Sequence, residues 1–108
     1  MRSLIDDKTE KLISEMNAGS IGAILEGLQY RGILYRINGI CNSVKYNIID
    51  ANIIRELEKL MNDERIIYGY SISDFAYAAL DLLGLKKYSG ERRQIWELIA
   101  SKFDFWMD

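Results

Sequence analysis

Two aspartates have the spacing that comes closest to a catalytic pair. Asp74 and Asp81 lie seven residues apart, so on a helix both carboxylates would project from one face, about 10 Å apart. Inverting glycosidases hold their acid and base carboxylates at roughly that separation. Asp74 also falls in the first turn of an expected helix, where a carboxylate interacts favourably with the helix dipole and needs no substrate. We favour this structural role and keep an enzymatic or small-molecule role as an alternative.

Other catalytic and metal chemistries lack the residue types they need. The chain has no histidine, so neither its serines nor its single cysteine has the usual base beside a nucleophile. Cys41 lies on the apolar stripe of an expected helix, where a free thiol packs as a small hydrophobe. No zinc set, EF-hand spacing or phosphate-binding glycine loop is present. We therefore expect a non-enzymatic protein without a metal or cofactor.

The composition predicts one cytoplasmic domain covering residues 1–108. A chain of 108 residues with 49% apolar and 28% charged side chains can bury a single core. Its net charge of −2, without a basic block, disfavours nucleic-acid binding. The apolar runs are too short to cross a bilayer, and the first residues lack the apolar stretch of a signal peptide. One cysteine fits a reducing compartment.

Six helices must position the polar side chains. Because the chain has no proline, capping residues and glycines mark the boundaries. Residues 62–70 are expected to form a loop packed down by its aromatics, since a lone strand would have no partner. Ser71 or Ser73 is expected to cap the fifth helix. The expected helices cover residues 5–16, 20–30, 33–46, 50–61, 72–83 and 91–105.

One helix pattern occurs twice, in residues 33–44 and 72–83. A shift of about forty residues superposes their apolar positions, a period typical of helical-pair repeats. One pair cannot bury its own apolar stripe, whereas three stacked pairs can. The sequence therefore predicts an all-α fold of three antiparallel helix pairs, stacked as a short solenoid or a compact bundle.

Two segments resemble HEAT repeats. Residues 27–40 (GLQYRGILYRINGI) are similar to a HEAT junction, in which one helix ends and an arginine begins the next. Residues 60–64, followed by 73–84, resemble the alanine-rich helix that ends such a repeat. The lack of proline in the turns and the insertion of residues 65–70, with Phe75 where arginine is expected, favour a compact HEAT-like domain over an extended array. Small bacterial HEAT-like proteins include immunity proteins, so the resemblance implies a protein partner, with a toxin as the concrete candidate.

Arg36 is the junction arginine of this resemblance. There it would donate hydrogen bonds to turn carbonyls or to an acidic partner such as Asp74 on the neighbouring pair. The alternative is a ligand anion held at the start of the helix. We favour the structural role because the fold itself supplies partners at a repeated junction.

The remaining polar positions predict a protein-binding face formed by alternate helices. The chain has seven tyrosines, and some would lie at the margin of this face, since tyrosine buries a large area and keeps a polar tip. We favour the interpretation that the tyrosines mainly seal the edges of helix pairs. A homodimer formed through the aromatic C-terminal helix is the alternative. The residues expected on the face are Gln29, Arg55, Glu56, Lys59, Arg92 and Arg93.

Overall fold

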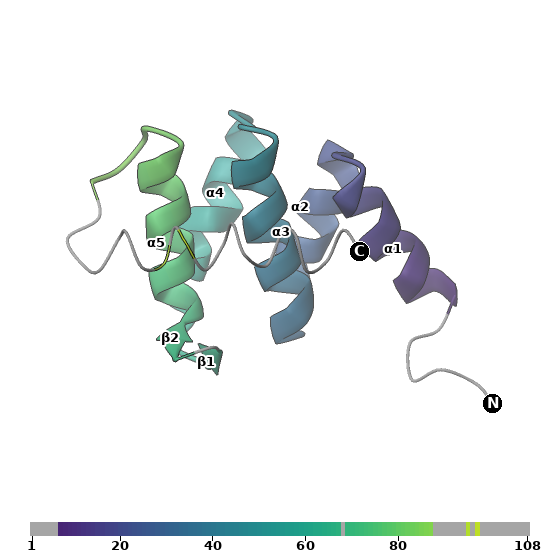
Figure 1. The fold of residues 1–108 in the computed structure, drawn as a ribbon, viewed down its shortest axis with the longest axis horizontal. Helices are drawn as coiled ribbons and strands as arrows, with labels where there is room; N and C mark the ends of the chain where they lie inside the picture. Colours follow the sequence, from purple (N-terminus) through teal and green to yellow (C-terminus); the bar gives the residue numbers. More distant parts are fainter. Residues whose placement is uncertain (1–6, 68, 88–94, 96, 98–108) are drawn as a thin grey trace.

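The computed structural model describes residues 7–67, 69–87, 95 and 97 (Figure 1). This part of the chain is mostly helical, which confirms the all-α class. The expected sixth helix, residues 91–105, lies outside the described residues except for Ile95 and Glu97, both of which are helical. The described elements are α1 (Asp7–Asn17), α2 (Ile21–Gln29), α3 (Ile33–Lys45), α4 (Ala51–Leu60), β1 (Ile66–Ile67), β2 (Tyr70–Ser71) and α5 (Ile72–Leu82).

Side-chain caps begin three of these helices. Ser20, Asp50 and Ser71 precede α2, α4 and α5, and each side-chain oxygen accepts a hydrogen bond from a backbone N–H of the first turn. These bonds satisfy donors that a helix start leaves without an intrahelical partner. Gly19 and Gly84, which follow α1 and α5, have φ angles of +88° and +79°, a conformation that glycine adopts without strain.

The segment between α4 and α5 differs from the expected loop. Ile66 pairs with Ser71 and Ile67 with Tyr70, so two short antiparallel strands form a hairpin. Gly69 has a φ of +85° in the connecting turn. The expectation was wrong because it considered one strand alone, whereas the same segment supplies both strands.

Helices α1 to α5 lie in two rows. In Figure 1, α1, α3 and α5 form the nearer row, and α2 and α4 lie behind them. Helix α3 is central because it packs against α1, α2 and α5, while α2 also packs against α1 and α4, and α4 against α5. The repeated helices are thus neighbours. Three superposed apolar pairs are buried in both helices: Ile37 with Ala76, Ile40 with Ala79 and Cys41 with Leu80. Ile33 and Val44, which superpose on buried Ile72 and Leu83, are half-buried.

A buried polar network joins α1 to α3. The side-chain Nδ2 of Asn42 donates to Asn17 Oδ1 at 3.0 Å and to Asn38 Oδ1 at 2.6 Å. Asn42 and Asn38 are both buried. Because a buried amide without partners is unfavourable, these bonds fix how α1 lies against α3.

Candidate functional site

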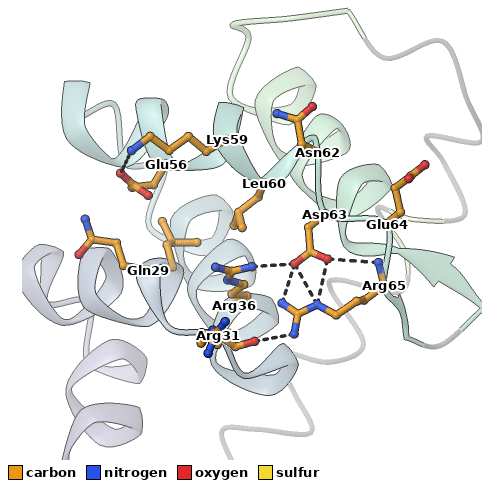
Figure 2. Close-up of a pocket in the computed structure, with 11 residues that line it drawn as sticks. Gln29, Arg31, Arg36, Glu56, Lys59, Leu60, Asn62, Asp63, Glu64 and Arg65 are labelled. Atoms are coloured by element: carbon orange, nitrogen blue, oxygen red, sulfur yellow. Dashed lines mark hydrogen bonds and ion pairs between the residues drawn. The ribbon is translucent and has the colours of Figure 1, made fainter.

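A hollow of about 700 Å³ lies where α2 and α4 end (Figure 2). The two helices pack against each other, so the segments that follow them meet at one edge of the molecule. Most of the lining side chains are charged. They are Leu28 and Gln29 from the end of α2, Arg31 and Arg36 from the turn and the start of α3, Glu56, Lys59 and Leu60 from α4, and Asn62, Asp63, Glu64 and Arg65 from the loop before β1.

The amphipathic pattern of α4 turns two charged side chains toward this hollow. Leu57 and Leu60 are buried, and Glu56 and Lys59 lie on an adjacent stripe, where the Lys59 side chain is 65% exposed and that of Glu56 only 13%. Lys59 Nζ lies 3.2 Å from Glu56 Oε2. One wall of the hollow is therefore an ion pair between residues three apart on a single helix.

Asp63 is the centre of the hollow's hydrogen bonding. Its Oδ2 accepts from Arg36 Nη1 and from Arg65 Nη2, each at 2.7 Å. Its Oδ1 accepts from Arg65 Nε at 3.0 Å and from the backbone N–H of Arg65 at 3.1 Å. The Asp63 side chain is 10% exposed. One largely buried carboxylate thus binds two guanidinium groups (Figure 2).

Further bonds tie this loop to the surrounding elements. Arg65 Nη1 donates to the carbonyl of Arg31 at 2.6 Å, which joins the hairpin to the turn between α2 and α3. The backbone N–H of Ser73 donates to the Asp63 carbonyl at 2.7 Å, and Ser73 Oγ donates to the Met61 carbonyl at 2.6 Å. The loop is therefore hydrogen-bonded to α3, to the turn between α2 and α3, and to α5.

The arginines keep the Asp63 carboxylate charged. Hydrogen bonds from the Arg65 side chain hold the pKa of Asp63 well below its ordinary value of 3.8, and Arg36 acts in the same direction, against the opposing effect of burial. Asp63 in turn raises the pKa of Arg65. Within the described part of the chain, Nε of Arg36 is a buried donor without an acceptor. The hydrogen-bond donors of the two arginines therefore outnumber the acceptors around Asp63.

The hollow brings together three of the residues expected on the binding face. Gln29, Glu56 and Lys59 all line it. Arg55 does not: it is exposed, and its Nη1 lies 3.4 Å from Asn52 Oδ1 on the same helix. Arg92 and Arg93 lie outside the described residues, as does most of the C-terminal helix expected to form a homodimer.

Arg36 has a different acidic partner from the one suggested by the sequence. It binds Asp63, not Asp74, because the loop after α4 returns to the start of α3 before α5 begins. Asp74 lies in the first turn of α5, where its backbone N–H donates to Ser71 Oγ at 3.1 Å. Neither Asp74 nor Asp81 lines the hollow.

Sequence reasoning missed Arg31, Asp63 and Arg65 as site residues. Asp63, Glu64 and Arg65 form a polar run shortly after the amphipathic helix expected at residues 50–61, in the longer of the two HEAT-like junctions. This polar run was the available sequence signal for the site. Nothing in the spacing indicates that Arg65 reaches the carbonyl of Arg31, which lies 34 residues earlier. That contact depends on the packing of α2 against α4.

The hollow offers hydrogen bonds and charge for binding. Its lining contains no histidine, cysteine or serine, and the described residues contain no cluster of three or more His, Cys, Asp or Glu side chains suited to a metal ion. Among the described helices, none is long and apolar enough to cross a membrane. Comparison of the chain with known protein families, curated proteins and solved structures finds no match.

Proposed function

We propose that this chain is a non-catalytic protein-binding module that contacts its partner through the hollow between the ends of α2 and α4. The observation that carries the proposal is the convergence of Gln29, Glu56 and Lys59 on one concave surface beside the Asp63 cluster. Gln29 comes from the end of α2, and Glu56 and Lys59 come from α4. Their convergence gives the surface a distinctive pattern of donors, acceptors and charges, which supports recognition of one partner.

The character of the lining favours a protein over a small molecule. Small-molecule pockets are mostly apolar, with a few polar groups that fix orientation. Here the apolar lining residues are Leu28 and Leu60, both of which are almost fully buried. A charged, open hollow matches the polar part of a protein interface instead.

The Asp63 cluster supports binding by keeping the surface rigid. The loop that carries Asp63 is bonded to α3, to the turn before α3 and to α5. A surface that is already ordered loses less conformational entropy when its partner binds. We infer that the cluster holds the loop in its binding conformation.

The proposed architecture is a short HEAT-like stack of antiparallel helix pairs. The two rows of helices and the contact between the repeated helices α3 and α5 support it. Stacked helix pairs form extended concave surfaces that repeat proteins use for binding. In its concrete form the proposal is an immunity or inhibitor protein that neutralises a toxin, motivated by the chain's size, its acidity and its resemblance to HEAT repeats.

The test compares two charge reversals on one helix. Lys59→Glu and Arg55→Glu change the net charge equally, and both side chains are exposed on α4, but only Lys59 lines the hollow. The tagged protein captures its partner from the native cells, and the affinity of the purified partner is then measured for each variant. We expect roughly tenfold weaker binding for Lys59→Glu and an unchanged affinity for Arg55→Glu.

Three results would contradict the proposal. Equal affinities for the two variants would place the interface elsewhere on the protein. A greater loss for Arg55→Glu would place it on another face of α4. Failure to recover any partner, with the protein monomeric and inert, would argue against a binding module.

A further inference from the structure

One edge of the hollow carries more positive than negative charge. Arg36 and Arg65 share the single carboxylate of Asp63. Arg31 adjoins them because its carbonyl accepts from Arg65, and among the described residues none forms a hydrogen bond or ion pair with the Arg31 side chain. Three guanidinium groups against the carboxylates of Asp63 and Glu64, which also lines the hollow, leave a surplus of one positive charge. On the opposite wall, Lys59 and Glu56 neutralise each other.

Two strongly exposed apolar side chains lie close to the cluster in the sequence. Ile66 is 65% exposed and Leu34 is 58% exposed, the highest fractions among the large apolar side chains that the structure describes. Ile66 follows Arg65 directly, and Leu34 lies in the first turn of α3, two residues before Arg36. Neither residue lines the hollow, and side chains two apart on a helix do not share a face. The arginines alone therefore define the chemistry of this edge.

We propose that this edge is a carboxylate subsite that takes a glutamate or aspartate side chain of the partner. The inference rests on the proposed function and adds the chemistry that is recognised. Arg31 makes the principal contact, because its planar guanidinium can donate two parallel hydrogen bonds to a carboxylate. Arg65 adds positive charge from beside it.

The fixed negative charges favour a carboxylate over a phosphate. Asp63 remains ionised between its two arginines, and Glu64 also lines the hollow. The single negative charge of a bound carboxylate is balanced by the surplus positive charge of the arginines. A phosphate group carries about −1.5 to −2 at neutral pH, so the surplus would leave part of its charge unbalanced.

The test uses defined probes because it does not need the natural partner. Acetyl-Leu-Glu-Leu-Glu-amide, the matched peptide acetyl-Leu-Gln-Leu-Gln-amide and inorganic phosphate are each titrated into the isotope-labelled full chain. Backbone amide signals and arginine Nε–H signals are followed by NMR. We expect the glutamate peptide to shift the signals of Arg31 and Arg65 with a dissociation constant on the order of millimolar. The glutamine peptide and phosphate are expected to leave them unchanged.

Variants connect the shifts to the named residues. Arg31→Glu should weaken binding of the glutamate peptide by roughly tenfold or more, because it removes charge-assisted hydrogen bonds. Arg55→Glu makes the same charge change as Arg31→Glu away from the hollow and should bind as the wild type does. Retained dispersion of the amide signals verifies that each variant is folded.

Several results would overturn the subsite. These are no shift with the glutamate peptide, equal shifts with both peptides, binding of phosphate in place of the peptide, or an Arg31→Glu variant that binds normally. The outcome is separate from that of the proposed function. If a partner is captured through Lys59 but the glutamate peptide causes no shift, only the subsite proposal is refuted. If the peptide causes shifts but no partner is captured, only the proposed function is refuted.

Discussion

Replacing Asp63 by asparagine should destabilise the fold, because this carboxylate joins the loop after α4 to α3. Asparagine keeps the shape of the side chain and loses its charge. Arg36 would then have no ionised partner at 2.7 Å, and Arg65 would lose its fork of bonds to both carboxylate oxygens. We expect Asp63→Asn to fold with the same architecture and to unfold more readily.

The size of the effect follows from the exposure of each partner. The side chains of Asp63 and Arg36 are 10% and 21% exposed, so their pair lies between a surface ion pair and a buried one. Arg65 is 42% exposed and contributes little, because solvent screens its charge. A hydrogen bond to a charged group contributes about 1.5–3 kcal/mol, and we expect a loss of about 2 kcal/mol. For a chain of this length that lowers the melting temperature by roughly 10 °C.

The assay is urea unfolding of both proteins at a series of pH values. Because the pKa of Asp63 is lowered in the folded state, its contribution is fully present above the unfolded-state pKa of about 3.9 and is lost as the pH falls through the folded pKa. The stability difference between wild type and Asp63→Asn should therefore be constant at neutral pH and shrink below about pH 4.

The adjacent residue provides the control for this prediction. Glu64→Gln removes the same charge from an exposed side chain in the same loop and should change the free energy of unfolding by less than about 0.5 kcal/mol. The reasoning is refuted if Asp63→Asn stays within that margin of wild type, or if its effect is unchanged at low pH.

Three further substitutions test the packing of the helices by urea unfolding. Gly27→Ala should destabilise by about 1–3 kcal/mol, because its methyl group would lie 2.3 Å from the sulfur of buried Met16. Gly22→Ala on the same helix meets no atom within 4 Å and should stabilise by about 0.5 kcal/mol through helix propensity; equal effects at the two glycines would contradict the packing described. Asn42→Ala should destabilise by about 2 kcal/mol, because the buried Asn38 side chain loses its donor; a neutral result would mean that the network adds nothing.

The helices could be predicted from the sequence because their signals are local. Ser20 and Asp50 are capping residues that stand directly before an apolar stripe, and the structure places them at the starts of α2 and α4. Most of the superposed apolar positions of α3 and α5 are buried for the same reason, since a period of 3.6 residues fixes one face of a helix. Local propensity and burial agree at these positions.

The hairpin and the Asp63 cluster could not be predicted in this way. Each depends on two segments that approach only after the helices pack: β1 needs β2, and Arg36 needs a carboxylate that lies 27 residues further on. From the sequence alone, Asp74 was an equally good candidate for the acidic partner of Arg36. The choice between the two aspartates is made by the path of the loop, which spacing does not encode.

A site-specific photo-cross-linking measurement tests most directly whether the hollow is the binding surface. A photoreactive residue is placed at Gln29, which lines the hollow, or at Glu15, which is exposed on α1 and does not line it. We predict that irradiation in the native cells joins the Gln29 variant to one other protein and leaves the Glu15 variant unjoined. An adduct from Glu15 alone, or the same adduct in equal yield from both positions, would contradict the account.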